Sequence, residues 1–102
     1  MAKKIVELST KRKVQLKEMS IDEVDICQDM TILKNDEDGN PYIMGVSRSR
    51  TAWLRRGING GDFKGFKKDA KDLVEDSVIK QLSEEEKNEV VALIQEYQNL
   101  GE

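Results

Sequence analysis

Two short alternating segments stand directly before a helix start signal, and this order constrains the fold more than any other feature of the chain. Residues 4–8 (KIVEL) and 13–17 (KVQLK) each place a valine and a leucine two positions apart, with STKR between them. Alternation with a period of two is typical of strands, so we expect a β-hairpin over residues 1–18. A hairpin of two strands is only marginally stable in water, and it therefore needs helices on its apolar face.

A capping box predicts the start of the first of these helices. In Ser20-Ile-Asp-Glu23 the serine hydroxyl can accept a hydrogen bond from the glutamate amide, while the glutamate carboxylate accepts one from the serine amide. Apolar residues then recur at helical spacing, which predicts a helix over residues 20–34. They are Ile21, Val24, Ile26, Cys27, Met30, Thr31 and Leu33. Because Cys27 lies on this stripe, we expect a buried and unreactive thiol.

The rest of the chain has the pattern of further helices around a glycine-rich break. Three more helices are predicted, over residues 47–56, 69–82 and 83–100. A second capping box, Ser83 to Glu86, begins the last of them. Between the first two we expect a flexible glycine-containing loop over residues 57–68.

The composition supports one small folded domain. Leu, Ile, Val and Phe make up 26 of the 102 residues. That share exceeds the ~20% below which disorder is expected, although charged residues are abundant. The expected fold class is therefore α+β, with the N-terminal β-hairpin packed on a small bundle of about four helices. The chain is expected to be mostly helical and to form a single domain over residues 1–102.

Charge is segregated along the chain. The net charge is +5 over residues 1–17, −7 over 18–47, +6 over 48–71 and −7 over 72–102, which together give the formal net charge of −3. One interpretation is internal neutralisation, with basic and acidic elements packed side by side. The other is a protein with distinct faces for different partners.

Several site classes lack the residues that they need. There is no histidine, and the one cysteine excludes an intramolecular disulfide and a thiolate zinc site within this chain. Residues 35–41 (NDEDGNP) resemble the start of a calcium loop, but the bidentate glutamate near its twelfth position is missing, so we expect a solvated turn. No stretch of ~20 apolar residues and no signal-peptide core occur. We therefore expect a cytoplasmic protein without catalytic residues, metal, cofactor or membrane partner.

The stretch RTAWLRRGINGGDFKGF, residues 50–66, holds the candidate binding residues. Its glycines match neither the phosphate-loop nor the dinucleotide-binding fingerprint. Its arginines and aromatics suit a protein-docking surface or a nucleic-acid surface, whereas the acidic chain as a whole argues against nucleic acid. The candidate partner-binding residues are Arg50, Trp53, Leu54, Arg55, Arg56 and Phe63, joined by Val90, Ile94 and Tyr97 of the last helix. The alternative is that the apolar members pack in the core.

The layout of the whole chain also carries a resemblance. A hairpin of the form V-E-L-S…K-V-Q-L-K-E-M-S leads into an acidic capped helix between Ile5 and Asp25, and the last helix reads L-S-x-E-E-K…L-I-x-E-Y between Leu82 and Tyr97. This layout resembles the tail assembly chaperones of tailed bacteriophages. The resemblance implies a non-enzymatic protein in the cytoplasm of an infected bacterial host, which binds the tape measure protein and tail tube subunits.

Two further expectations concern partners. The apolar face of the last helix makes self-association of the chain a further expectation. The alternative to the chaperone function is a small phage-type nucleic-acid-binding or host-takeover regulator that acts through the basic segment 48–71.

Overall fold

A computed structural model describes residues 3–99 and contains one three-stranded antiparallel sheet beside a layer of helices. The sheet has the order β1-β2-β5 and is formed by β1 (Lys3–Glu7), β2 (Lys13–Lys17) and β5 (Ile58–Gly61). Val6 pairs with Val14 in the expected N-terminal hairpin, and Val14 in turn pairs with Gly61. The hairpin is therefore extended by a third strand that the sequence did not predict.

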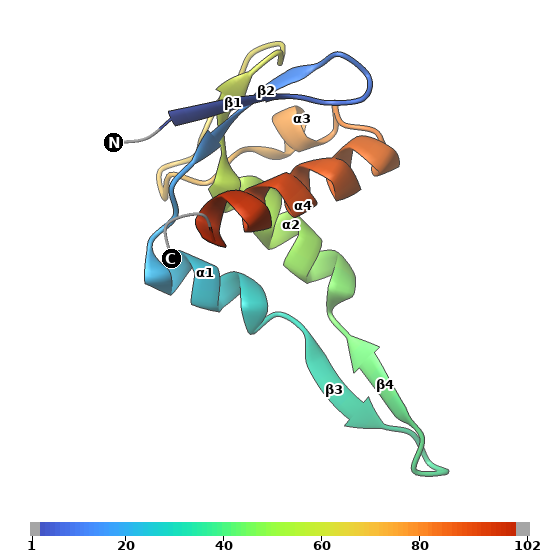
Figure 1. Cartoon of the computed structure of the whole chain (residues 1–102). Coiled ribbons are helices and arrows are strands. Elements are labelled where there is room, and N and C mark those ends of the chain that lie inside the picture. The colour runs from blue at the N-terminus through green and yellow to red at the C-terminus, as the bar shows by residue number, and fades with distance from the viewer. Residues whose placement is uncertain (1–2, 100–102) are drawn as a thin grey trace.

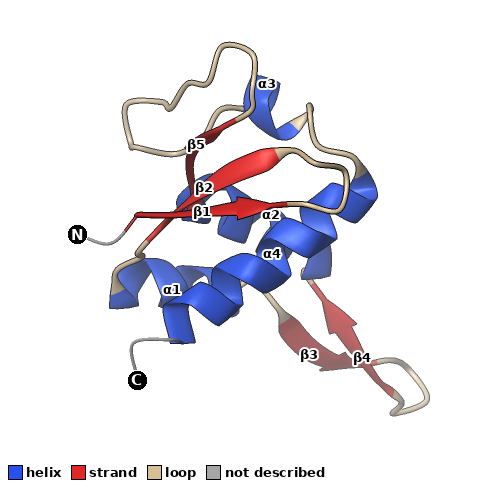
Figure 2. Cartoon of the chain, turned by 45° about the horizontal axis from the view of Figure 1, so that its top comes forward, coloured by secondary structure: helices blue, strands red, loops and turns tan. Residues whose placement is uncertain are grey.

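The three longer helices are α1 (Ile21–Gln28), α2 (Val46–Gly57) and α4 (Glu84–Asn99), and a single-turn helix, α3 (Asp76–Ile79), lies near β5. Two of the three longer helices, α2 and α4, lie against this sheet, and α1 packs on α2 beyond the end of β2 (Figures 1 and 2). Helix α2 packs on both α1 and α4. The fold is thus α+β, as expected, with more residues in helices than in strands.

The core lies between the sheet and α2 and α4. The alternating positions Leu8, Val14 and Leu16 of the N-terminal hairpin are buried, which confirms the face predicted for them. They meet the buried side of the helices. The same core cluster includes Trp53, Leu54, Val90 and Ile94 of the helices, together with Ile58 of β5. Cys27 is also buried, and burial raises the pKa of its thiol to about 11, in agreement with the unreactive cysteine expected.

A second hairpin projects from this body (Figure 1). It consists of β3 (Ile32–Asn35) and β4 (Pro41–Met44), which pair antiparallel and have their contacts mainly with each other. The molecule measures 46 Å along its longest axis and 30 Å along the other two. Its radius of gyration is 14.7 Å, larger than the ~13 Å of a compact chain of this length. We call residues 32–44 the projecting hairpin.

The helix predicted over residues 20–34 is wrong beyond its second turn. Helix α1 ends at Gln28, with Asp29 as its C-cap, and the Thr31 hydroxyl donates to the Gln28 carbonyl at 3.1 Å. The Ser20–Glu23 capping box is present as predicted. Ile32 and Leu33 continue the apolar pattern, but they belong to β3, because the residues beyond the turn at 36–40 return as a pairing strand.

The loop predicted over residues 57–68 is wrong in its first part. Residues 58–61 form β5, in which Gly60 and Gly61 have φ values of 143° and 127° that other residues rarely adopt. A Cβ on Gly61 would lie 2.4 Å from the carbonyl oxygen of Lys13. The glycines thus allow close approach to β2, whereas the prediction for them was a flexible loop.

The helix predicted over residues 69–82 is also wrong, since only Asp76–Ile79 is helical. The Asp69 carboxylate accepts from the amides of Lys71 and Leu73, which stabilises a turn in competition with a helix. Asp72 has a φ of 64°, and the amide of Val74 donates to the carbonyl of Arg55 in α2. By contrast, the helices predicted over 47–56 and 83–100 agree with α2 and α4 within about one residue over the described part of the chain, and position 100 lies outside it.

The basic and acidic blocks of the chain pair largely with one another. Six of the seven ion pairs within residues 3–99 join a basic block to an acidic one, for example Arg12 to Glu86, Arg50 to Glu84 and Arg55 to Asp76. Exposed pairs of this kind contribute little stability singly. They nevertheless favour the interpretation in which the blocks neutralise one another.

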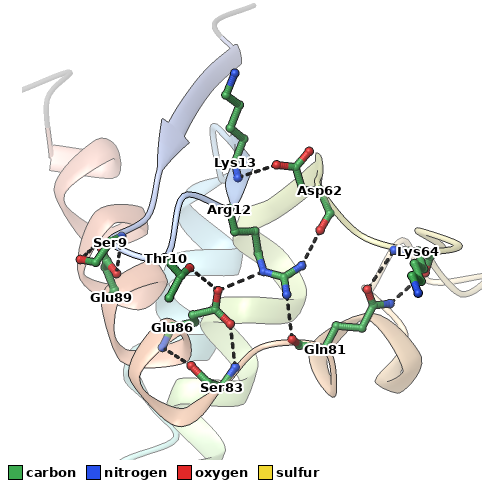
Figure 3. A network of polar contacts seen from close by, with 10 residues as sticks. All are labelled: Ser9, Thr10, Arg12, Lys13, Asp62, Lys64, Gln81, Ser83, Glu86 and Glu89. Carbon is green, nitrogen blue, oxygen red and sulfur yellow. Dashed lines mark hydrogen bonds and ion pairs between the residues drawn. The ribbon is translucent and has the colours of Figure 1, made fainter.

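A polar network joins the β1–β2 turn to the start of α4 (Figure 3). One oxygen of Glu86 accepts from the Ser83 amide at 2.9 Å and completes the predicted capping box. The other oxygen accepts from the Thr10 hydroxyl at 2.6 Å and from Arg12 at 3.1 Å. The Arg12 guanidinium also donates to the carbonyls of Asp62 and Gln81, so one side chain links four segments.

The network makes stability depend on acid in a defined way. The Thr10 hydroxyl, together with the Ser83 amide and Arg12, lowers the pKa of Glu86 to about 2 against the opposing effect of burial. The folded pKa lies below the ordinary 4.5, so the unfolded chain binds this proton more readily. The contribution of Glu86 is therefore complete above about pH 4.5 and is lost as pH falls toward about 2.

We expect Glu86→Gln to weaken this acid dependence. At neutral pH the variant should lose about 1–3 kcal/mol of unfolding free energy, because hydrogen bonds to a buried carboxylate are removed. Below pH 4.5 the gap between variant and wild type should narrow. Urea unfolding between neutral pH and pH 3 measures both effects. Glu85→Gln, at an exposed neighbouring position, is the control, and an unchanged gap at every pH would contradict the assignment.

Candidate protein-interaction surface

The exposed apolar side chains of this protein gather on the projecting hairpin and its base. Nine large hydrophobic side chains are exposed among the described residues, and six of them lie between residues 32 and 46. They are Ile32, Leu33, Tyr42, Ile43, Met44 and Val46. A concentration of exposed apolar side chains of this kind is typical of a binding site for another protein.

The register of the hairpin divides these side chains between its two faces. Leu33 pairs with Ile43, and their side chains are 72% and 63% exposed. Ile32 pairs with Met44 on the opposite face, where both are less exposed. Because neither face is covered by a helix, the pairing alone buries too little apolar area to stabilise two strands well. The hairpin therefore has the properties of an element completed by a partner.

A tight acidic turn closes the far end of the hairpin. The Asp36 carboxylate accepts from the amides of Asp38 and Asn40 at 2.9 and 2.8 Å, and Gly39 has the left-handed φ of 83°. This is the solvated turn that the sequence predicted for residues 35–41. The sequence analysis did not recognise that it joins two strands, although a glycine-containing turn between apolar segments is a hairpin signal.

The base of the hairpin is held where its two ends meet. Gly45 is the N-cap of α2, and a Cβ at this position would lie 2.0 Å from the carbonyl oxygen of Met30. The Ser49 hydroxyl donates to the carbonyl of Cys27 at 3.0 Å, which ties the first turn of α2 to the end of α1. Both strands are thus anchored to helices at one end only.

The two strands have free edges as well as free faces. In a two-stranded antiparallel ladder, about half of the backbone N–H and C=O groups of each strand point away from its partner. Such edges can pair with a further strand. Pro41 in β4 lacks an N–H, so β3 is the more complete edge.

A basic groove begins beside the hairpin base and follows α2. Its volume is about 490 Å³. It is lined by Met30, Ser47, Arg48, Thr51, Ala52, Arg55, Arg56 and Leu73. Arg55 donates to the carbonyl of Val74 and pairs with Asp76, whereas Arg48 and Arg56 form no ion pair within residues 3–99. We call this feature the arginine groove.

The residues singled out from the sequence do not form one surface. Leu54, Val90 and Ile94 are fully buried and Trp53 is 4% exposed, so for these four the alternative of core packing holds. The remaining five lie at separate places. Arg50 pairs with Glu84, Arg55 and Arg56 line the groove, Phe63 contacts Phe66 and Arg12, and Tyr97 lies beneath Lys4. The sequence analysis missed the projecting hairpin as a site.

Other site classes find little support in the described part of the chain. Within residues 3–99 no group of three or more cysteine or acidic side chains is placed to hold a metal ion. Nor does this part contain a helix long and apolar enough to cross a bilayer.

The fold and its exposed surface define a small α+β protein with an unpartnered apolar hairpin. Comparison with family models, with curated proteins and with solved structures gave no match.

Proposed function

We propose that this protein is a non-enzymatic assembly chaperone that binds an aggregation-prone client through the projecting hairpin. The observation that carries the proposal is the concentration of exposed hydrophobic side chains on residues 32–46. Burying one such side chain in an interface stabilises the complex by about 1.5–3 kcal/mol. A few of them are enough to hold an apolar client segment.

The sequence resemblance supplies the class of client. Tail assembly chaperones of tailed bacteriophages bind the tape measure protein and tail tube subunits in the cytoplasm of the infected bacterial host, and we propose the same partners here. A highly charged body bearing one apolar extension suits this role, because the charges keep the complex dissolved while the extension covers the client.

Replacing Leu33 and Ile43 by serine tests the proposal. Both side chains are largely exposed, so the body should fold as in the wild type. We expect the double variant to bind a tape measure fragment at least about 100-fold more weakly, since about 3 kcal/mol or more of apolar contact is removed. Isothermal titration measures the affinity, and solubility of the co-expressed fragment gives a second readout.

Ile5→Ser with Ile21→Ser is the matched control. These side chains are 66% and 80% exposed and lie outside the projecting hairpin. The control variant should bind as the wild type does. Equal loss in both variants, or undiminished binding by the hairpin variant, would contradict the proposed site.

Nucleic-acid binding is the second candidate, and the arginine groove is the observation that favours it. Arg48 and Arg56 could contact phosphates. Against it, Arg50, Arg55 and Lys68 of the basic segment already pair with carboxylates. A steep salt dependence of duplex or single-stranded nucleic-acid binding, abolished by Arg48→Glu, would favour this candidate over the chaperone.

A further inference from the structure

The far end of the projecting hairpin carries unpaired negative charge. Asp36, Glu37 and Asp38 are exposed, against one positive charge on the hairpin, Lys34. The Asp36 carboxylate is occupied by the turn, whereas Glu37 and Asp38 form no ion pair among the residues described. These two carboxylates are therefore available to a cationic surface.

The arginine groove is a cationic surface of complementary character on the same molecule. Arg48 and Arg56 lack carboxylate partners within residues 3–99, and Met30 and Leu73 give the groove apolar flanks. The hairpin of the same copy points away from the body, so its acidic turn is not placed in its own groove (Figure 1). A second copy carries the turn that fits.

The position of the groove at the hairpin base sets the orientation of such a pair. The acidic turn lies at least about 10 Å from the base, since β4 alone spans three steps of about 3.4 Å from Met44 to Pro41 and the turn lies beyond it. If two hairpins lie side by side in opposite directions, the turn of each reaches the base of the other, where Arg48 lies. The arrangement has a two-fold axis, so both contacts form together.

From these observations we infer that two copies of this chain associate through their projecting hairpins in antiparallel orientation, with the acidic turn of each against the arginine groove of the other. The same packing covers exposed hydrophobic side chains of both hairpins. The thirteen residues of the hairpin and the eight that line the groove give twenty-one per copy. That number falls within the roughly 20–30 residues that each side of a standard interface provides.

The pairing has one consequence that rests on the proposed function, whereas the dimer itself does not depend on that function. Client and second copy use the same apolar side chains of the hairpin. The dimer is then a resting form that protects the hairpin, and a client displaces the second copy by mass action.

Charge exchange between two variants tests the inference. The turn variant is Glu37→Arg with Asp38→Arg, and the groove variant is Arg48→Glu with Arg56→Glu. Each variant alone places like charges at both contacts, so we expect its dimer dissociation constant to rise at least about tenfold above that of the wild type. An equimolar mixture restores opposite charges at both contacts and should form a one-to-one heterodimer.

Sedimentation velocity measures the association, and circular dichroism checks that each variant is folded. The wild-type dimer should weaken as salt rises from about 0.05 M to about 1 M, because the charges are increasingly screened. If the groove variant does not fold, Arg48→Glu alone replaces it, since Arg48 is exposed. A monomeric wild type, a variant that dimerises as the wild type does, or a mixture that stays monomeric would each overturn the inference.

Failure here and failure of the proposed function give different results. A monomeric wild type whose Leu33→Ser, Ile43→Ser variant still loses the client overturns the dimer and leaves the chaperone function intact. If the charge-exchange variants dimerise as expected but the Leu33→Ser, Ile43→Ser variant still binds the client, the dimer holds and the chaperone function is overturned. A monomer whose groove variant loses a nucleic acid or a client instead assigns the groove to that occupant, and it overturns the inference.

Discussion

Trp53→Ala is expected to lower the free energy of unfolding by about 3–5 kcal/mol, through the loss of buried area and the cavity left behind. The Trp53 side chain is only 4% exposed. Its ring borders two hollows shared with Val24 of α1 and Val91 of α4, so it packs where three helices meet. A domain of this size has about 5–15 kcal/mol in total. Urea unfolding followed by circular dichroism measures the loss.

Arg48→Ala provides the control for this prediction. Arg48 belongs to the same helix but is exposed, and a substitution there should change stability by less than about 0.5 kcal/mol. A loss below about 1 kcal/mol for Trp53→Ala would contradict the packing described. The expected result also limits binding experiments: a Trp53→Ala protein that fails to bind a partner reports damage to the core.

Gly45→Ala is expected to cost about 2–5 kcal/mol and to loosen the projecting hairpin. The left-handed φ of 81° costs a residue with a Cβ about 1–2 kcal/mol. The Cβ would also lie 2.0 Å from the Met30 carbonyl oxygen, so the backbone must move apart, which adds about 1–3 kcal/mol. Unfolding free energy and hydrogen exchange of the hairpin amides measure the two effects.

Gly39→Ala separates conformation from crowding. Its φ of 83° is nearly that of Gly45, but a Cβ at this position would meet nothing within 4 Å. The Gly39 variant should therefore lose only the conformational part, about 1–2 kcal/mol, and should keep the base of the hairpin protected. Equal losses at the two positions would show that contact with Met30 is not what anchors the hairpin.

Local signals in the sequence predicted the elements whose stability is mainly local. The capping boxes at Ser20 and Ser83 begin α1 and α4, and the alternating valines and leucines form β1 and β2 with the expected inward face. The sequence also predicted the burial of Cys27. These features depend on neighbours a few residues apart, and such neighbours are visible in the sequence.

The candidate site depends on pairings that the sequence shows only weakly. Ile32 and Leu33 extend a helical stripe as well as they begin a strand, and only the partner strand ending at Met44 decides between the two. In the sequence, Trp53 and its arginine neighbours resemble a docking motif. In the structure α2 packs against α4, and Trp53 is buried. The arginines of the groove come from one helix, but Met30 and Leu73 complete it from distant segments.

By itself the sequence determined that this is a small α+β chain in which capping boxes begin two of the helices, α1 and α4. It also determined that most of the core comes from alternating and helical apolar positions. The tertiary structure alone decided that β5 joins the sheet, that the predicted contact residues Leu54, Val90 and Ile94 belong to the core, and that residues 32–44 leave the body. The physical reason is that burial is a property of the assembled chain: an apolar side chain is a contact surface only where no other element covers it.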